Sequence, residues 1–188
     1  MQTLQALKKR CSVRTFNAKP VPRNLVEELI DCARLAPTAR NVQPWEFVVI
    51  TKKDTLQELG SLAENGSFIK DSSCCIAVFS QETKYYLEDG CAATENILIA
   101  AYDLGLSSCW VAGDKKPYAD KVRELLGMPS DFKLVSLIPL GYSDAEPDLP
   151  AKRPLKEILH WEEYKREGTV PDTLIYGEPK GAVPKTFS

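Results

Sequence analysis

The sequence predicts a mixed β-sheet flanked by helices, in a single domain of the α+β or α/β class. Apolar runs typical of four strands alternate with stretches of helical periodicity, and no tight hairpin turn joins two strands. The 188 residues are enough for one core, since a chain of this size buries about 70% of its unfolded surface.

The N-terminal part of the chain predicts two helices before the first strand. Residues 3–10 form the first, which ends in a run of basic residues. The second begins at Asn24, whose side chain can cap the amide of Glu27, and it is closed by Pro37.

The middle of the chain predicts a strand, a helix and a buried strand. Residues 45–50 are rich in β-branched and aromatic side chains, and a helix follows over 54–63. The run 74–79 is almost wholly apolar, which is typical of a central strand covered on both faces.

The remaining elements complete the sheet. The stretch 88–104 is apolar on most sides, which predicts a buried helix, and Gly105 supplies a left-handed stop. A strand over 107–112 follows, then a helix from Pro117 to Gly127, and a last strand over 134–140.

A tail rich in proline and apolar residues follows Gly141. Six of the thirteen prolines lie between Pro147 and Pro184, around one short helical piece at 154–164, so a second core is not expected. The large apolar residues of the tail are Leu149, Leu155, Ile158, Leu159, Trp161, Tyr164, Leu174, Ile175 and Tyr176. We therefore expect a domain over residues 1–160 and an arm over 161–188 that packs against another surface.

The charge pattern argues against nucleic-acid and membrane partners. The 24 basic and 26 acidic residues are interspersed, so no broad basic field exists to bind phosphates or an anionic membrane. The apolar run 97–102 meets Asp103 far short of a membrane span, and no signal peptide follows Lys8-Lys9-Arg10. We expect a cytoplasmic protein.

The cysteines do not predict a metal site or structural disulfides. The chain has no CxxC pair, and adjacent Cys74 and Cys75 would point to opposite faces of a strand. His160 lies in a polar stretch and is expected at the surface. The six cysteines are Cys11, Cys32, Cys74, Cys75, Cys91 and Cys109.

Two N-terminal motifs carry the functional signal. Residues 10–16, RCSVRTF, place two guanidiniums and a hydroxyl within five positions, a combination suited to phosphates and planar polar groups. Residues 36–45, APTARNVQPW, form a helix end followed by a polar loop. No G-x-G occurs among the ten glycines, so a nucleotide-like cofactor must be held in another way.

In this order, and about one helix apart, these motifs resemble signatures of the nitroreductase family, FMN-dependent oxidoreductases that use NAD(P)H. The segment 107–113, SSCWVAG, resembles the family segment against which the flavin ring rests. The resemblance covers residues 4–160 and implies an α+β three-layer sandwich in an intertwined homodimer. FMN would lie at the subunit interface, and the 161–188 arm would pack on the partner subunit.

The resemblance implies residues for the flavin phosphate and for the pyrimidine edge. Arg10, Lys152 and Arg153 would bind the phosphate, although such cations also complement helix ends or stay solvated. At the pyrimidine edge, Ser12 and Arg14 would contact the ring, and Arg14 would stabilise negative charge there.

Two further positions accompany this edge. Cys11 would contribute its backbone to the same edge. Asn65 is either a ring-contacting amide or a turn residue before Gly66.

The second motif would cover the flavin from the opposite subunit, or it is a plain connection between helix and strand. Its candidate residues are Pro37, Thr38, Ala39 and Asn41. Asn41 and the nearby Gln43 would satisfy backbone or cofactor groups.

The 107–113 segment would support the other face of the ring. The candidates are Trp110, Val111, Ala112 and Gly113, with the Gly113 amide as the donor to flavin N5. Some longer family members carry Glu where Ala112 stands, and Trp110 is alternatively a plain core aromatic.

The implied reaction is ping-pong hydride transfer from NAD(P)H through flavin N5 to an electron-poor small molecule such as a nitroaromatic or quinone. No catalytic side chain is expected, because the flavin carries the redox chemistry. The alternative is a non-catalytic redox sensor based on bound flavin or on a thiol, with Cys11 between two arginines as its candidate.

Overall fold

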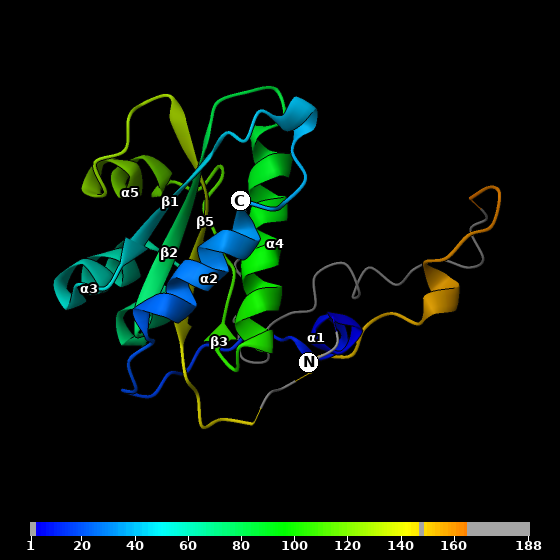
Figure 1. Cartoon of the computed structure of the whole chain (residues 1–188), viewed down its shortest axis with the longest axis horizontal. Helices are drawn as coiled ribbons and strands as arrows, with labels where there is room; N and C mark the ends of the chain where they lie inside the picture. The colour runs from blue at the N-terminus through cyan, green and yellow to red at the C-terminus, as the bar shows by residue number, and fades with distance from the viewer. Residues whose placement is uncertain (1–2, 147–148, 165–188) are drawn as a thin grey trace, which may run out of the picture. The chain divides into compact units, whose positions relative to one another are not determined.

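The computed structural model describes residues 3–146 and 149–164. The chain separates into two compact units, 1–149 and 150–188. The boundary between them lies before residue 160, the end of the domain expected from the sequence. The first unit contains the sheet and five helices (Figure 1). Within the described part of the second unit, the one regular element is the 3-10 turn η3, Leu155–Glu157, where the sequence predicts a helical piece over 154–164.

The helices of the first unit are α1 (Thr3–Lys9), α2 (Arg23–Ala33), α3 (Lys53–Leu62), α4 (Tyr86–Asp103) and α5 (Ala119–Leu125), with 3-10 turns η1 (Ala39–Asn41) and η2 (Ser67–Asp71). The strands are β1 (Trp45–Ile50), β2 (Cys74–Gln81), β3 (Ser107–Ser108), β4 (Val111–Ala112) and β5 (Phe132–Gly141). No helix in the described part of the chain is long and apolar enough to cross a membrane.

The strand order is β1-β2-β5-β3, and β4 also pairs with β5. All four pairings between described strands are antiparallel, whereas the sequence predicts a mixed sheet. Apolar content identifies a strand but not its direction, which is set by the segment that returns the chain to the sheet. Here the neighbouring strands β2 and β5 are connected by a long segment of the chain that includes α4 and α5.

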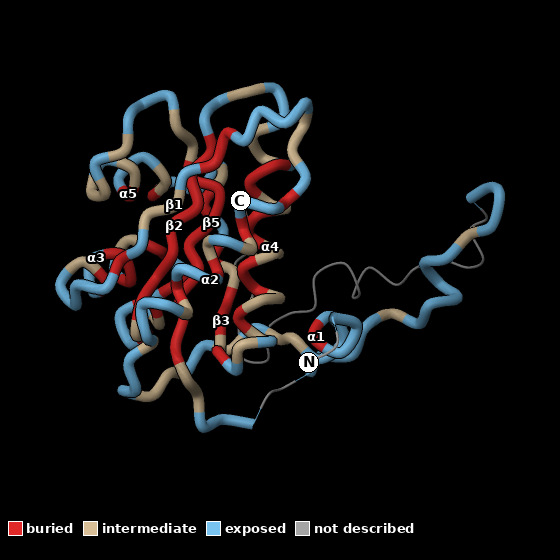
Figure 2. The backbone as a smooth tube through the Cα atoms, viewed as in Figure 1, coloured by how far each residue is buried: buried red, intermediate tan, exposed pale blue. Residues whose placement is uncertain are grey.

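Helices cover both faces of the sheet, so the fold is the expected three-layer α+β sandwich. On β2, Cys74, Ile76 and Val78 belong to one buried cluster together with α2 and α4. The alternate residues of β2, Cys75 and Ala77 among them, belong to a second cluster with α3, η2 and α5. Figure 2 shows β2 and β5 buried along most of their length, which confirms a central strand at 74–79.

Helix α4 packs very closely on β5. A Cβ added at Gly90 would lie 2.6 Å from Val135 Cγ2. One turn later, the hydroxyls of Thr94 and Ser136 are 2.8 Å apart in the buried core. This contact fixes α4 over the strand that carries the edge pairings of β3 and β4.

The ends of α2 differ from the expectation. Pro22 occupies the N-cap position, and no side chain caps the helix, so the predicted cap at Asn24 is wrong. The helix ends at Ala33, and a turn, not Pro37 itself, closes it. The amides of Leu35 and Ala36 donate to carbonyls three residues earlier in this turn.

The predicted strand over 107–112 is present but interrupted. β3 and β4 pair with β5 in one continuous register, Ser108 opposite Leu140 and Val111 opposite Leu137. In this register Pro139 lies opposite Cys109, and proline has no N–H to complete the ladder. The helix stops were predicted correctly, since Gly105 and Gly127 have φ values of 74° and 68°.

Candidate functional site

The first motif lies against the β3–β4 edge. The Val13 amide donates to the Ser108 carbonyl at 2.9 Å. Burial raises the pKa of the neighbouring Cys109 thiol, and this effect is opposed by Arg14, by a hydrogen bond with Ser12 and by Arg10. The structure therefore brings Arg10, Ser12 and Arg14 together around Cys109, although their predicted roles toward a cofactor stay predictions.

The two arginines of this motif have different surroundings. Arg10 Nε lies 3.5 Å from Glu95 Oε1 on α4, and the Arg10 side chain is 27% exposed. Arg14 is exposed, and its guanidinium carbon lies 5.9 Å from the ring centre of Phe68 in η2. Arg14 forms no ion pair with any carboxylate of the described residues, and its guanidinium instead contacts the Phe68 ring.

The loop that carries Asn65 reaches the same edge. A Cβ at Gly66 would lie 2.8 Å from Ala63 Cβ and 3.0 Å from Val111 Cγ1, so this loop packs closely against β4. Asn65 is exposed beside this contact. Its position is compatible with both the ring-contacting role and the turn role.

The pairing of β4 with β5 contradicts one expectation. The Gly113 amide donates to the Val135 carbonyl at 3.0 Å, so it is not a free donor for a flavin ring, and that predicted role is wrong. Consecutive residues of an antiparallel ladder alternate between facing the partner strand and facing away from it. The amides of Ala112 and Trp110 therefore point away from β5.

Ala112 is the better donor on this edge. It is exposed, whereas Val111 and Gly113 on either side are buried. The Tyr118 hydroxyl donates to the Ala112 carbonyl, which leaves the Ala112 amide as the free polar group of this residue. The sequence indicated the segment but not Tyr118, and the choice between Ala112 and Gly113 depends on the register of β5. Trp110 is half-buried and packs against the core cluster.

The second motif is organised by a residue that the sequence did not indicate, Asp89 in the first turn of α4. Thr38 Oγ1 donates to Asp89 Oδ2 at 2.8 Å, and the Ala39 amide lies 3.2 Å from Asp89 Oδ1. The Gln43 amide donates to Thr38 Oγ1 at 3.1 Å, which closes the loop. Asn41 is exposed and has a φ of 57°. Pro37 is also exposed.

The two motifs are not joined within the described part of one chain. None of its hydrogen bonds or ion pairs links residues 37–43 to residues 10–14. A role of the 37–41 loop at the flavin of another subunit stays a prediction.

Lys152 and Arg153 belong to the second unit. Arg153 Nη2 donates to the Glu157 carbonyl at 3.0 Å, and Nε lies 3.6 Å from Glu157 Oε2. Lys152 is exposed. Their contribution to a phosphate site with Arg10 stays a prediction.

The remaining candidates concern thiols and metals. All six cysteines are free thiols, and Cys11 is half-exposed. Burial raises the pKa of Cys74 to about 11 and raises that of Cys75 further, because the latter is fully enclosed. The residues that the structure describes contain no group of three His, Cys, Asp or Glu able to hold a metal ion. His160 is half-buried rather than fully exposed, with its ring centre 4.6 Å from that of Tyr164.

Comparison with known proteins gives a consistent family. The sequence model of the nitroreductase family matches residues 7–72 and 80–142 of this chain. A provisionally named NADH dehydrogenase/NAD(P)H nitroreductase from Methanothermobacter thermautotrophicus is 31% identical over 155 residues, which cover 78% of this chain and 80% of that protein.

Solved structures agree with this match. An FMN-dependent nitroreductase from Clostridium difficile R20291 is 28% identical with a TM-score of 0.79, covering 86% of this chain and 99% of the other. A Parabacteroides distasonis protein of the same provisional name as the archaeal relative has 27% identity and a TM-score of 0.83, covering 87% and 99%. The chain therefore belongs to the nitroreductase family.

Proposed function

We propose that this chain is an FMN-dependent oxidoreductase that takes hydride from NAD(P)H and delivers it, in ping-pong fashion, to an electron-poor small molecule such as a nitroaromatic or quinone. Family membership and the FMN-dependent solved relative support the cofactor. A Vibrio harveyi relative named NADPH-flavin oxidoreductase, 23% identical, supports the donor class. The observation that carries the proposal is the convergence of Arg10, Ser12 and Arg14 on the β3–β4 edge.

The residues present fit a flavin. A flavin ring needs donors at its polar rim and an apolar wall beneath it, and its phosphate needs cations. The β3–β4 edge offers the outward amide of Ala112 beside the buried side chain of Val111. Ser12 and Arg14 supply a hydroxyl and a cation at the same place, and Arg14 has no ion-pair partner within residues 3–146 and 149–164.

FMN, when bound, supplies the capacity to accept and donate hydride, so the protein has to provide position and electrostatics. Arg14, whose guanidinium lies over the Phe68 ring, would stabilise negative charge at the pyrimidine edge of the bound flavin. The Ala112 amide, which faces away from β5, would donate a hydrogen bond to the ring. Arg10, whose guanidinium is paired with Glu95, would hold the flavin phosphate.

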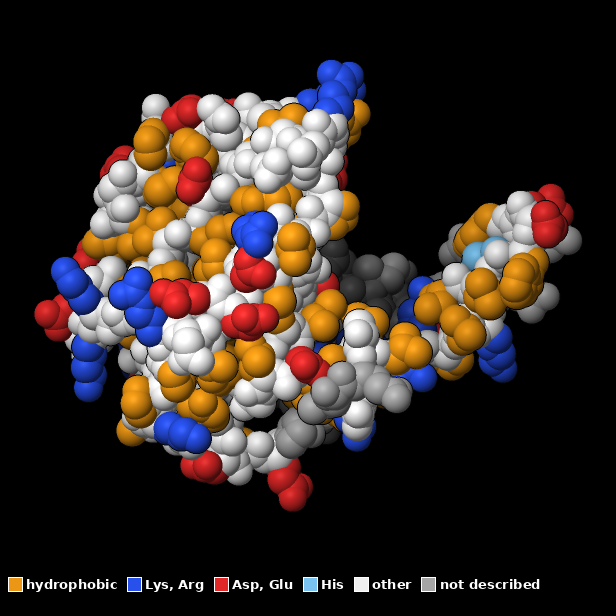
Figure 3. Space-filling model, viewed as in Figure 1, with side chains coloured by type: hydrophobic (Ala, Val, Ile, Leu, Met, Phe, Trp, Pro, Cys, Tyr) orange, Lys and Arg blue, Asp and Glu red, His pale blue; other side chains and the backbone are white. Residues whose placement is uncertain are grey.

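We further propose that the active form is a homodimer with FMN at the interface and with the 161–188 arm on the partner. Residues 165–188 of this arm lie outside the described part of the chain. Large side chains of the second unit are exposed, with Trp161 at 77% and Tyr164 at 70%. Figure 3 shows hydrophobic side chains gathered on the described part of the second unit, up to residue 164. A monomeric soluble protein rarely exposes so much apolar surface without a partner.

The first unit has an apolar groove that supports the same proposal. It has a volume of about 400 Å³, lies between α1, α2 and α4, and is lined by Ala6, Leu35, Ile99 and Leu104 among others. Sedimentation of the purified protein should show a dimer, since an interface of about 2,000 Å² or more is stable. A monomer that binds FMN would contradict the dimer proposal while leaving the cofactor intact.

The test of the flavin site is Arg14→Ala. The loss of a charged hydrogen-bond donor from the site should weaken FMN binding by about tenfold or more. The matched control is Arg23→Ala, because Arg23 is a 91% exposed arginine on α2 whose partner is Glu27. The dissociation constant of FMN is measured by fluorescence quenching on apoprotein. Equal effects of the two substitutions would contradict the assignment of Arg14.

A further inference from the structure

Asp89 is a carboxylate that packs against a loop rather than facing water. It is 5% exposed, and a buried carboxylate is tolerated when donors satisfy its oxygens. Here each oxygen has a donor from the loop, the Thr38 hydroxyl for Oδ2 and the Ala39 amide for Oδ1. Its place in the first turn of the 18-residue α4 adds the favourable end of the helix dipole.

The loop that Asp89 holds has an unusual backbone. Arg40, Asn41 and Gln43 have φ values of 57°, 57° and 54°, a region that side-chain-bearing residues rarely adopt. All three are exposed, so burial of their side chains does not stabilise this conformation. Backbone strain of this kind persists only where surrounding contacts impose it, and it is concentrated at functional sites.

Two of the contacts that impose it share one hydroxyl. Thr38 Oγ1 donates to Asp89 and accepts from the Gln43 amide at 3.1 Å. Both ends of the strained turn are therefore tied to α4 through the pair of Asp89 and Thr38. Without Asp89, the loop loses its hydrogen bonds to α4 among the described residues.

We propose that Asp89 is a positioning residue that holds the Thr38–Gln43 loop in the conformation that binds FMN. The inference rests on the proposed function, because the loop's role at the cofactor is part of that proposal. Because such a loop is already ordered before binding, cofactor binding would lose little conformational entropy in it. Asp89 acts through Thr38 and Ala39 and does not itself touch the cofactor.

The experiment uses Asp89→Ala, Asp89→Asn and Thr38→Val in the full-length protein. FMN dissociation constants are measured on apoprotein, and Asp89→Ala should weaken binding by about tenfold or more. Asp89→Asn keeps one acceptor for the Ala39 amide and should recover part of this loss. In the double variant Asp89→Ala/Thr38→Val the loss should be smaller than the sum of the two single losses, because both changes break the Asp89–Thr38 hydrogen bond; Thr38→Val also removes the acceptor of the Gln43 amide.

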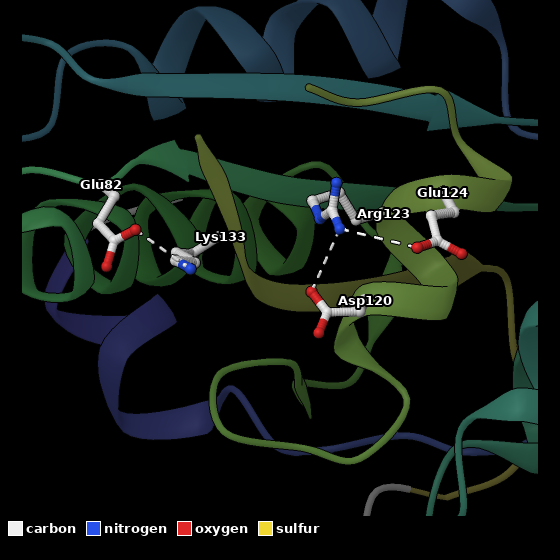
Figure 4. A network of polar contacts seen from close by, with 5 residues as sticks. All are labelled: Glu82, Asp120, Arg123, Glu124 and Lys133. Carbon is white, nitrogen blue, oxygen red and sulfur yellow. Dashed lines mark hydrogen bonds and ion pairs between the residues drawn. The ribbon is translucent and has the colours of Figure 1, made fainter. Parts of the chain in front are cut away.

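A second readout follows the loop itself. Trypsin cleaves after Arg40, and in the apoprotein this cleavage should be faster in Asp89→Ala than in the wild type. The control is Asp120→Asn, because Asp120 is an 84% exposed carboxylate whose partner Arg123 is also paired with Glu124 (Figure 4). This control should change neither measurement.

The outcomes separate the two proposals. Faster cleavage with unchanged FMN affinity, or weaker affinity with unchanged cleavage, would overturn the positioning role of Asp89 and leave the flavin function standing. If Asp89→Ala does not fold, Thr38→Val decides on the same two measurements. A wild-type protein that binds no FMN would overturn both proposals.

Discussion

Gly90→Ala tests how tightly α4 is seated on the sheet. The added Cβ would lie 2.6 Å from Val135 Cγ2 and 3.1 Å from Val135 Cγ1, both shorter than a carbon contact allows by several tenths of an ångström. Val135 is 2% exposed and lies on β5, which is paired with β2 on one side and with β4 on the other. Neither the helix nor the strand can move away freely.

Two effects of opposite sign decide the magnitude. Alanine stabilises a helix interior by about 1 kcal/mol relative to glycine. Overpacking of a well-packed core costs about 1–3 kcal/mol. Because the clash is with side-chain methyl groups on a strand fixed from both sides, we expect the second effect to prevail. The net result should be a loss of about 1 kcal/mol in the free energy of unfolding.

The assay is urea unfolding followed by circular dichroism at one fixed protein concentration, since association would contribute to stability. Gly90→Ala should lower the midpoint without changing the slope. In the double variant Gly90→Ala/Val135→Ala, the removal of the methyl groups should make the total loss smaller than the sum of the two single losses. A Gly90→Ala protein as stable as the wild type, or more stable, would refute the close packing of α4 on β5.

Two further predictions concern thiols and a tyrosine. In the folded protein a thiol reagent should modify the half-exposed Cys11, Cys32 and Cys91, and should reach the buried Cys74, Cys75 and Cys109 only on unfolding; rapid modification of all six would contradict their burial. The Tyr86 hydroxyl donates to Asp114 at 2.7 Å, which, together with burial, raises the pKa of Tyr86 to about 12. Because the folded state keeps this proton above the unfolded pKa of about 10, the contribution to stability is complete below pH 10 and is lost as the pH rises toward 12. Tyr86→Phe should therefore flatten the alkaline fall in the urea midpoint, and an unchanged fall would contradict the hydrogen bond.

Local signals in the sequence were sufficient to locate most elements. The apolar run of β2, the apolar helix α4 and the glycines that end α4 and α5 each determine structure within a few residues, so the sequence alone locates these elements. Strand direction, and the break opposite Pro139, depend on which distant segments become neighbours. The missing side-chain cap of α2 shows a different limit, because Pro22 took the position that a capping side chain would have needed.

The candidate site divides in the same way. Arg10, Ser12 and Arg14 are recognisable because they lie within one short motif. The amide of Ala112, rather than that of Gly113, faces outward because of pairing with β5, more than 20 residues later in the chain. Asp89 could not be found from the sequence, since its partners Thr38 and Ala39 lie about 50 residues earlier and only the packing of the loop on α4 brings them together.

The most direct test of the account is the visible absorption spectrum of the purified protein, before and after anaerobic addition of NADH or NADPH. We predict a yellow protein with about one FMN per chain, whose absorption is bleached by the reduced nicotinamide and returns when a nitroaromatic or quinone is added. A colourless protein that takes up no FMN when supplied in excess would contradict the central claim that the β3–β4 edge and the first motif form a flavin site.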